Sequence, residues 1–503
     1  MDTEDTAPCI SLVGANGLEM EVPTGLFIDN QFIPSVTGSL LEVINPNTNQ
    51  PLGQIASASS ADIDAAVQSS LQAYKATWRD TAPATRRDLL NRLADLMVRD
   101  TDILASIESL DVGALYTAGK YFTVPLAVEW LRYFAGWADK LDGRSTAVVE
   151  GGKVAGMAYT RREPLGVTAA ITPWNSPLLI STWKVAQALT TGNTLILKPA
   201  ELAPLGPMYL GKLAREAGFP NGVLNVVPGI GNIAGKALAQ HAHVRKISFT
   251  GSTAVGRQIL HDAASSNLKK VALELGGKSP TIVFDDADVN QTAIWAARGI
   301  TAVEGQVCLA GSRIYVQDKV YDAFCEAFVK ETSQAVLGDP LLEKTTKGPI
   351  ISSTQLAKVA AYIEQGRKEA TLLRGGNCVE NSVTTTAFSD VPETATIMTE
   401  EIFGPVAAIA RFHTVQEVVD KANDTEYGLS AAIFTTSLAR AHQVASALES
   451  GQVTVNAWGL LSANMPFGGY KQSGFGRDGG EEALAEWTTI KAVKIFTGED
   501  QGH

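Results

Sequence analysis

The stretch Val167-Thr168-Ala169-Ala170-Ile171 is the first of four short apolar runs that decide the fold. Three similar runs follow at residues 194–197, 224–227 and 246–249. The segments between them have the length and the amphipathic pattern of helices, which start near Pro177, Pro204 and Asn232. This alternation predicts a parallel, doubly wound sheet with helices on both faces. Ligands of such sheets bind beyond the carboxyl ends of the strands.

A second α/β unit is predicted after the first. Strand-like runs at residues 281–284, 313–316 and 431–434 continue the alternation, and Cys308 lies among them. Residues 59–140, which precede the first unit, have a helical pattern with apolar side chains on one face. We expect the two α/β units to share a cleft that Cys308 borders.

The composition argues against several classes of protein. A chain of 503 residues suggests two to four domains of about 100–200 residues each. The net charge of −12, with no basic run, argues against nucleic acid as a partner. No apolar run is long enough to cross a bilayer, and the acidic start of the chain is unlike a leader peptide. We therefore expect no membrane partner and a cytoplasmic location.

The cysteines and histidines give no sign of a metal site. The four cysteines are widely spaced and form no CxxC pair. Among the six histidines only His241 and His243 are close together, and no Cys or acidic cluster adjoins them. We expect neither a metal site nor a disulfide framework.

The residues that suggest chemistry lie in two glycine-rich segments, Gly305-Gln306-Val307-Cys308-Leu309-Ala310-Gly311 and Glu274-Leu275-Gly276-Gly277-Lys278. A thiolate that attacks a carbonyl can form a thioester, and a carboxylate is then needed to activate water. Most cysteines are inert packing residues, as Cys325 is expected to be, but small and polar neighbours set Cys308 apart. Glu274 lies within the apolar run Val271-Ala272-Leu273-Glu274-Leu275, so it either faces a cavity with a raised pKa or pairs with a cation.

Seven further motifs are spread along the chain: Phe27-Ile28-Asp29-Asn30, Asn45-Pro46, Thr172-Pro173-Trp174-Asn175, Lys198-Pro199-Ala200-Glu201, Phe249-Thr250-Gly251-Ser252-Thr253, Glu400-Glu401-Ile402-Phe403-Gly404-Pro405 and Pro466-Phe467-Gly468-Gly469-Tyr470-Lys471. Together with the two segments above, they resemble the motifs of the NAD(P)-dependent aldehyde dehydrogenase superfamily, in the same order. The resemblance implies an α/β fold with two doubly wound parallel-sheet domains and a small β oligomerisation extension.

The resemblance also implies a domain organisation. Residues 1–141 and 165–276 would form the dinucleotide-binding domain, and residues 277–476 the catalytic domain. Residues 142–164 and 477–503 would form the extension. Alternating apolar residues with no obvious internal partner are found at 141–160 and at 487–496. Because such an extension joins subunits, we expect a homodimer or a homotetramer.

The function implied by the resemblance is the oxidation of a small-molecule aldehyde to a carboxylic acid. The hydride acceptor would be NAD⁺, with NADP⁺ as the disfavoured alternative. Cys308 would add to the aldehyde, Asn175 and the Cys308 backbone N–H would hold the oxyanion, and Glu274 would activate water. Taken alone, an asparagine before Ser-Pro is a turn residue.

Two glycine-rich turns compete for the phosphates of the cofactor. Gly229-Ile230-Gly231-Asn232-Ile233-Ala234 fits the dinucleotide pattern, but no acidic residue follows about 20 residues later, so a tight turn is an equal interpretation. Gly251-Ser252-Thr253-Ala254-Val255-Gly256 opens a helix after a strand, where free N–H groups suit a pyrophosphate, although Ser252 also fits a helix cap. The resemblance favours Gly251, Ser252 and Gly256 for the phosphates and moves Gly231 toward the adenine.

The remaining predicted cofactor contacts follow strands or lie in later motifs. Lys198 and Glu201 come after the run at residues 194–197, where a carboxylate would accept hydrogen bonds from ribose hydroxyls and repel a 2′-phosphate. A solvated surface pair is the alternative. The resemblance assigns Glu401 and Phe403 to the nicotinamide ribose. It also implies contacts from Ile171, Thr172, Trp174 and Leu275.

The chain departs from the family pattern on the substrate side. Residues 301–304 are Thr-Ala-Val-Glu where the family often has an aromatic residue and an asparagine, and Ser176 replaces a common aromatic residue. These smaller side chains predict a channel for bulky or branched aldehydes. Two alternatives stay open: a catalytically silent structural or binding protein, and a variant that passes the acyl group to coenzyme A. Glu274 weighs against the second, because coenzyme A-dependent members generally lack that glutamate.

Overall fold

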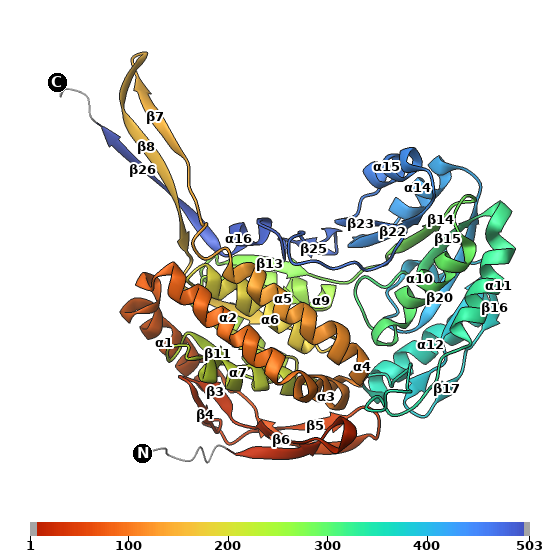
Figure 1. Ribbon diagram of the computed structural model, residues 1–503, viewed down its shortest axis with the longest axis horizontal. Helices are drawn as coiled ribbons and strands as arrows, with labels where there is room; N and C mark the ends of the chain where they lie inside the picture. The colour runs from red at the N-terminus through yellow and green to blue at the C-terminus, as the bar shows by residue number, and fades with distance from the viewer. Residues whose placement is uncertain (1–7, 497–503) are drawn as a thin grey trace.

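The computed structural model describes residues 8–496, which form two α/β units and a protruding arm (Figure 1). Residues 1–7 of the predicted dinucleotide-binding domain and residues 497–503 of the predicted extension lie outside the described residues. The chain enters the second unit after residue 277 and returns to the first sheet near residue 474. The limits predicted for the domains stay predictions.

The first unit is built on an eight-stranded sheet whose centre is parallel. Its strands, in order across the sheet, are β25 (Gly474–Phe475), β13 (Lys270–Glu274), β12 (Lys246–Thr250), β9 (Val167–Ile171), β10 (Thr194–Lys198), β11 (Leu224–Val226), β3 (Leu26–Ile28) and β4 (Gln31–Ile33). The five strands from β13 to β11 run parallel, and they include the four apolar runs that the sequence predicts. The edge strands β25, β3 and β4 pair in antiparallel fashion.

The register of the parallel strands brings polar and reactive residues to one edge. Ile171 pairs with Lys198 on one side and with Phe249 on the other. Thr250, the residue after Phe249 on β12, pairs with Glu274 of the neighbouring strand β13. All five residues therefore lie at the carboxyl ends of their strands, which is the edge where ligands of doubly wound sheets bind.

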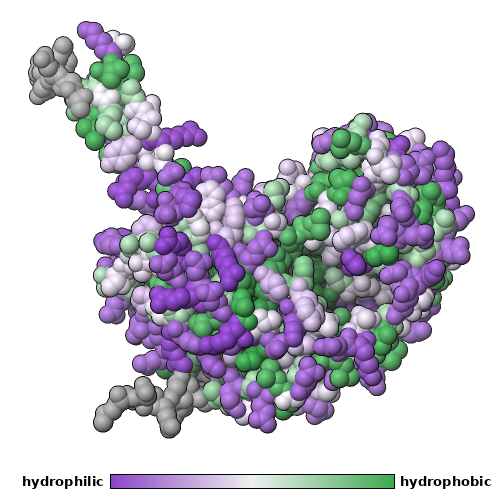
Figure 2. Space-filling model, viewed as in Figure 1, coloured by the Kyte–Doolittle hydropathy of each residue, from purple (hydrophilic) through white to green (hydrophobic). Residues whose placement is uncertain are grey.

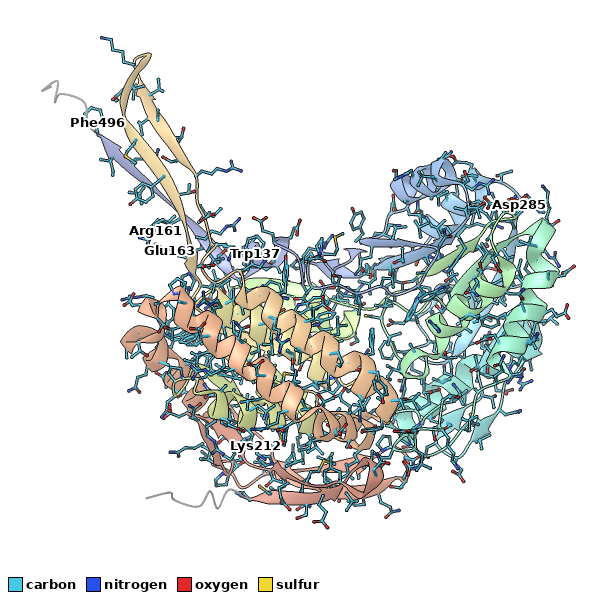
Figure 3. The ribbon with its side chains drawn as sticks, in the orientation of Figure 1. Trp137, Arg161, Glu163, Lys212, Asp285 and Phe496 are labelled. Carbon is cyan, nitrogen blue, oxygen red and sulfur yellow. The ribbon has the colours of Figure 1, made fainter. Side chains whose placement is uncertain are left out.

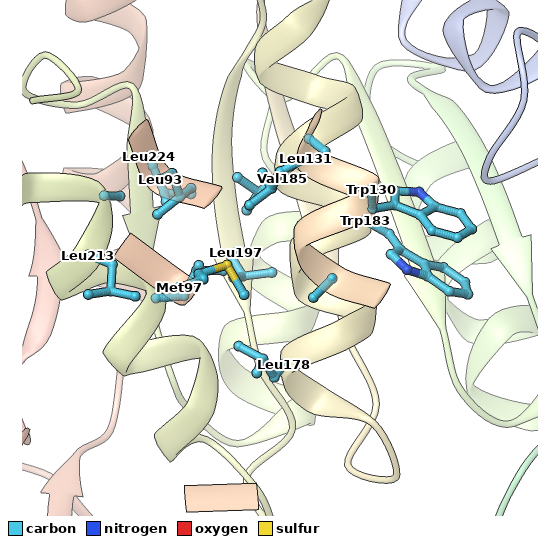
Figure 4. Close-up of a cluster of buried hydrophobic side chains, with 14 of the residues drawn as sticks. Leu93, Met97, Trp130, Leu131, Leu178, Trp183, Val185, Leu197, Leu213 and Leu224 are labelled. Atoms are coloured by element: carbon cyan, nitrogen blue, oxygen red, sulfur yellow. The ribbon is translucent and has the colours of Figure 1, made fainter. Parts of the chain in front are cut away.

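Helices cover both faces of this sheet. They are α1 (Ser60–Ala76), α2 (Pro83–Arg99), α3 (Thr101–Val112), α4 (Tyr116–Ala118), α5 (Val124–Ala135), α6 (Pro177–Thr190), α7 (Leu205–Ala217), α8 (Lys236–Gln240) and α9 (Thr253–Ala264). Leu195 and Leu197 belong to the core under α2, α5, α6 and α7, whereas Ile196 belongs to the core under α1, α8 and α9. Figure 4 shows the first core, where the rings of Trp130 and Trp183 stack with their centroids 4.3 Å apart.

The starts of the first helices follow from local sequence. Ser59 and Asp62 form a reciprocal capping box at the start of α1, and Pro83 is the first residue of α2. Leu93 and Met97 of α2, which belong to the helical pattern predicted for residues 59–140, are buried. The helix expected near Asn232 begins as a π turn at residues 231–235 and continues as α8.

The second unit is built on a seven-stranded sheet that is parallel except at one edge. Its strands, in order, are β16 (Thr371–Arg374), β19 (Thr386–Ser389), β20 (Val406–Phe412), β15 (Arg313–Gln317), β14 (Pro280–Val283), β22 (Ser430–Phe434) and β23 (Gln452–Val455). Its helices are α10 (Val289–Thr301), α11 (Tyr321–Thr332), α12 (Ser353–Glu369), α13 (Thr396–Thr399), α14 (Val415–Asn423) and α15 (Leu438–Ala447). The three strand-like runs predicted for this unit are β14, β15 and β22, and Cys308 lies between α10 and β15.

The arm is a three-stranded antiparallel sheet that leaves the first unit, as predicted for the extension. It consists of β7 (Ser145–Glu150), β8 (Lys153–Pro164) and β26 (Thr488–Phe496), in the order β26-β8-β7, and α16 (Glu482–Glu486) precedes β26. Figure 3 places Glu163 at the base of the arm and Phe496 farther out. Val149, Val154 and Ile490 are 64, 72 and 65% exposed. Figure 2 shows hydrophobic residues over the outer part of the arm.

The remaining strands of the described residues form short antiparallel pairs. They are β1 (Cys9–Val13) with β2 (Glu19–Pro23), β5 (Leu40–Asn45) with β6 (Gln50–Ala56), β17 (Cys378–Val379) with β18 (Ser382–Val383), and β21 (Tyr427–Gly428) with β24 (Tyr470–Lys471). Among the helices of residues 8–496, none has both the length and the apolar character needed to cross a bilayer.

Candidate functional site

A cavity of about 310 Å³ lies between the two units, at the carboxyl edge of the first sheet. Its wall is largely apolar and includes Leu179 and Phe467. Figure 2 shows the surface hollowed between the units, with hydrophobic residues in the hollow. Cys308, Glu274 and Asn175 all line this cavity. The fold therefore brings the three catalytic candidates together, although they are far apart in the sequence.

Cys308 lies in the loop between α10 and β15 and is partly buried. The loop passes so close to the end of β13 that a Cβ atom at Gly277 would lie 2.3 Å from the Cys308 carbonyl oxygen. Burial, followed by the negative charges of Glu401 and Glu274, raises the pKa of the Cys308 thiol to about 12. The thiolate of Cys308 is therefore a stronger base than that of an exposed cysteine, and less of it is present at neutral pH.

Glu274 is the last residue of β13 and is 5% exposed. Its Oε2 atom is buried and has no hydrogen-bond partner among the described residues. Burial, followed by the negative charge of Asp478, raises the pKa of Glu274 well above its ordinary range, and Lys184 partly opposes this rise. Of the two interpretations of Glu274, the geometry favours a carboxyl group that faces a cavity. A raised pKa is the direction that a general base near neutral pH requires.

An ion pair that the sequence analysis missed lies close enough to influence Glu274. Lys184 of α6 donates a hydrogen bond to Asp478 over 2.5 Å, and both side chains are buried. Asp478 also lines the cavity. One signal was present in the sequence: Lys184 is the one charged residue of the helical segment 177–190, which is rich in apolar residues. The structure buries that segment completely, so its lysine needs an anion as a partner. Its partner, 294 residues later, has no comparable signal.

Asn175 lies between β9 and α6, directly before Ser176 and the first helical residue, Pro177. Its Nδ2 donates a hydrogen bond to the Gln306 carbonyl oxygen over 2.8 Å. A side-chain amide has two N–H donors, so the second is available to a ligand in the cavity. The contact ties Asn175 to the loop that carries Cys308, which the turn interpretation does not require.

Lys198, Glu201 and Ser252 gather at the carboxyl edge of the first sheet. The Lys198 side chain is buried; its Nζ donates to the Pro199 carbonyl over 3.0 Å and lies 3.5 Å from Glu201 Oε2. The Glu201 side chain is 43% exposed. Ser252 caps α9 by accepting a hydrogen bond from Val255 N. An accessible carboxylate beside a fixed ammonium, and a nearby helix start, match the ribose and pyrophosphate of a dinucleotide.

The other predicted cofactor residues belong to the sheet edge or to the second unit. At strand ends, or in the turns and first helical turn after them, lie Ile171, Thr172, Gly251, Gly256 and Leu275. Gly231 opens the π turn that follows β11. The rings of Trp174 and Phe403 meet edge to face with centroids 5.2 Å apart. Glu401 Oε1 accepts a hydrogen bond from Gly277 N over 2.9 Å, so these later motifs contact the first-unit motifs directly.

The other cysteines and the possible metal ligands are distributed differently. Cys325 is buried in α11, as its apolar surroundings predict, and Cys9 and Cys378 are exposed. Of the four cysteines, all within the described residues, Cys308 is the one that lines the cavity. In residues 8–496, no group of three or more Cys, His, Asp or Glu could hold a metal ion.

Known proteins resemble this chain over nearly its whole length. The sequence model of the aldehyde dehydrogenase family matches residues 32–493. An aldehyde dehydrogenase of Alternaria alternata is 46% identical over 96% of this chain and 97% of its own length. Aldehyde dehydrogenase, cytosolic 1, of Rattus norvegicus is 45% identical over 94% of this chain and 95% of its own length.

Solved structures agree with the sequence comparison. The NAD⁺ complex of aldehyde dehydrogenase from Bacillus cereus is 42% identical and superposes with a TM-score of 0.92, covering 94% of this chain and 96% of that one. The predicted fold class is thereby confirmed, and this relative was solved with NAD⁺, the cofactor that the sequence predicts for the present chain. On the family match, the identities and the shared fold, the chain belongs to the aldehyde dehydrogenase family.

Proposed function

We propose that the protein oxidises an aldehyde to the free carboxylic acid through a thioester at Cys308. The observation that carries this proposal is the arrangement of Cys308, Glu274 and Asn175 around one largely apolar cavity. When bound, NAD⁺ supplies the hydride acceptor for the oxidation. The protein itself supplies the nucleophile, the stabilisation of the oxyanion and the base.

Cys308 is the nucleophile of the first half-reaction. Its thiolate adds to the carbonyl carbon of the aldehyde, and the carbonyl oxygen becomes negatively charged. The free N–H of Asn175 and the backbone N–H of Cys308 donate hydrogen bonds to that oxygen. The apolar wall strengthens these interactions because it excludes water. Once the carbon has been oxidised, the acyl group remains bound to Cys308 as a thioester.

Glu274 is the general base of the second half-reaction. Its carboxylate takes a proton from a water molecule, which attacks the thioester carbon and releases the acid and the Cys308 thiolate. The raised pKa of Glu274 makes its carboxylate a stronger base than an exposed one. Lys184 favours the ionised form of Glu274 and Asp478 opposes it, so this ion pair adjusts the strength of the base.

The cofactor residues divide by the chemistry that they offer. Glu201 accepts hydrogen bonds from the adenosine ribose beside Lys198, and the amino end of α9, with Gly251, Ser252 and Gly256, binds the pyrophosphate. Glu401 and Phe403 hold the nicotinamide ribose. The remaining contacts come from Ile171, Thr172, Trp174, Gly231 and Leu275. Supporting these assignments are the shared sheet edge and the contacts between the motifs of the two units.

The substrate is proposed to be a bulky or branched aldehyde. Ser176, Ala302 and Val303, which are smaller than the residues common in the family, line the cavity. The cavity volume of about 310 Å³ lies at the lower end of the range of about 300–1,000 Å³ for small-molecule sites. Its apolar wall favours an aldehyde with an apolar body.

Assembly and location are proposed on separate grounds. The arm exposes apolar side chains, and the outer edges of β7 and β26 pair with no other strand of residues 8–496. Association into a homodimer or a homotetramer would cover them. A cytoplasmic location is supported by the similarity to a relative named cytosolic.

Incubation with NAD⁺ and a panel of aldehydes is expected to produce NADH, followed by its near-ultraviolet absorbance. Cys308→Ala should abolish the reaction without unfolding the protein, because the change removes only the nucleophile. The matched control is Cys325→Ala on α11, which should retain activity. Turnover in Cys308→Ala would contradict the thioester mechanism, and a parent protein that is inactive with every aldehyde would support the catalytically silent alternative.

Glu274→Gln should slow the hydrolysis of the thioester more than its formation, because the amide cannot take a proton from water. The expected trace is a burst of NADH of about one equivalent per site, followed by a slow steady rate. Hydroxylamine attacks a thioester without a base, so adding it should restore turnover. Loss of the burst would instead assign Glu274 to activation of the thiol. Turnover that depends on coenzyme A would favour the acyl-transfer alternative.

Ser176→Phe should lower kcat/KM for bulky aldehydes relative to acetaldehyde, because the ring fills part of the cavity that Ser176 lines. Ser176→Ala is the matched control, since it removes the hydroxyl group without adding volume. Steady-state kinetics with a linear and a branched series measure the effect. An equal loss for small and large aldehydes would show that Ser176 does not limit the size of the substrate.

The native protein should prefer NAD⁺ to NADP⁺, because Glu201 repels a 2′-phosphate and would lose its hydrogen bonds to the ribose. The expected penalty is about 1–3 kcal/mol, partly offset by Lys198, whose Nζ lies 3.5 Å from Glu201. Values of kcat/KM for both cofactors in the parent and in Glu201→Gln measure it. Glu216→Gln, which removes a charge at the far end of α7, is the control. If Glu201→Gln shows no shift in preference toward NADP⁺, Glu201 does not contact the adenosine ribose.

A further inference from the structure

The loop before Cys308 has an unusual backbone. Val303, Glu304 and Gly305 are consecutive residues with φ angles of 46°, 58° and 69°. This left-handed region is unfavourable for a β-branched residue such as Val303. At Gly305, a Cβ atom would lie 2.4 Å from the Gly404 carbonyl oxygen, so the turn is pressed against the Glu-Ile-Phe-Gly-Pro segment. Such a conformation persists only where its surroundings hold it.

A buried ion pair holds this left-handed turn. The side chains of Glu304 and Lys347 are 7% and 2% exposed. Lys347 Nζ donates to Glu304 Oε2, and the backbone N–H of Gly348 donates to Oε1 over 2.8 Å. Both oxygens of the carboxylate are therefore bound by the segment that precedes α12.

The same loop carries the acceptor that orients Asn175. The Gln306 carbonyl accepts from Asn175 Nδ2 over 2.8 Å, and the Gln306 side chain accepts from Ile351 N over 3.1 Å. The backbone N and the Nε2 of Gln306 both donate to the Val303 carbonyl over 3.0 Å. The position of the Gln306 carbonyl is thus set by the left-handed turn on one side and by residues 347–351 on the other.

We propose that Glu304 and Lys347 are positioning residues of the oxyanion site. Their ion pair holds the left-handed turn, the turn sets the Gln306 carbonyl, and that carbonyl aims the free N–H of Asn175 at the oxyanion. The inference rests on the proposed function, because it concerns the addition of Cys308 to a carbonyl carbon.

A role limited to packing would not require charges at this position. Burying two ions is unfavourable, and an apolar pair of similar volume would fill the same space without that penalty. The ion pair fixes the orientation of the Glu304 carboxylate, because Lys347 and the Gly348 N–H bind different oxygens of that carboxylate. Glu304, the last residue of the Thr-Ala-Val-Glu run that departs from the family pattern, thus pairs with Lys347, which lies 43 residues later.

Two reactions of Cys308 separate orientation from reactivity. With 4-nitrophenyl acetate, the thiolate attacks the ester carbonyl, an oxyanion forms, and 4-nitrophenolate leaves with the electron pair of the broken bond. With iodoacetamide, the same sulfur displaces iodide and no oxyanion forms. The rate constant for the ester divided by that for iodoacetamide therefore measures how well the protein stabilises the oxyanion. Changes in the thiolate population or in access to Cys308 affect both rate constants and cancel from this ratio.

Glu304→Gln and Lys347→Met should each lower this ratio about tenfold, since a misplacement of about 1 Å in a catalytic group can cost about 100-fold in rate. Each single variant leaves one buried charge unpaired. The double variant Glu304→Gln/Lys347→Gln leaves none, and its two amides can hydrogen-bond to each other. Its ratio should return to within about threefold of the parent value.

Controls keep the test decisive. Asp100 is another buried carboxylate, and it pairs with Arg99 at 2.7 Å. Because Asp100 does not line the cavity, Asp100→Asn should leave the ratio unchanged. If either single variant does not fold, as judged by circular dichroism, Glu304→Asp replaces it. This variant keeps both charges, shortens the reach by one methylene and should lower the ratio about threefold.

The outcomes distinguish this inference from the proposed function. An unchanged ratio in folded Glu304→Gln or Glu304→Asp would overturn the positioning role, and so would a ratio in the double variant no higher than in the single ones. A parent protein that iodoacetamide alkylates but the ester does not acylate would overturn the thioester chemistry and this inference with it.

Discussion

Parallel pairing of β9, β10, β12 and β13 is the interaction on which the site depends. Backbone hydrogen bonds fix the register so that Ile171, Lys198, Thr250 and Glu274 all end their strands at one edge. Because the carboxyl ends of parallel strands point the same way, the turns that follow them converge on one space. The second unit closes this space by bringing Cys308 against the end of β13, where a side chain at Gly277 would block the approach.

The apolar character of the cleft explains why its few charges have strong effects. Burial raises the pKa values of both Cys308 and Glu274, so the proposed nucleophile and the proposed base are easier to protonate than exposed groups of the same type. Two other buried carboxylates of this region, Asp478 and Glu304, each bind a lysine. Glu274 differs from them because one of its oxygens has no partner among the described residues, which leaves it available to a water molecule or a substrate.

The fold was largely predictable from the sequence, because its signals are local, and the sequence also pointed to Cys308, Glu274 and Asn175, which the structure brings to one cavity. Alternating strand and helix patterns identified the sheets, and Cys308 and Glu274 lie in glycine-rich segments that a reader can recognise. The supporting pairs were not predictable. Lys184 meets Asp478 across 294 residues, and Glu304 meets Lys347 across 43. Only the folded chain shows which cation belongs to which buried anion. The left-handed conformation at Val303 has no sequence signal, since a β-branched residue argues against it.

The return of the chain to the first sheet has a consequence for biosynthesis. Strand β3 begins at Leu26, yet β25, which covers the edge of β13, ends at Phe475, and Asp478 reaches Lys184 only after that. During translation the unit that begins first is thus among the last to be completed. Until the final segment emerges from the ribosome, β13 keeps an uncovered edge and Lys184 lacks its anion. A nascent chain in that state exposes a strand edge to other chains and is a natural client for chaperones.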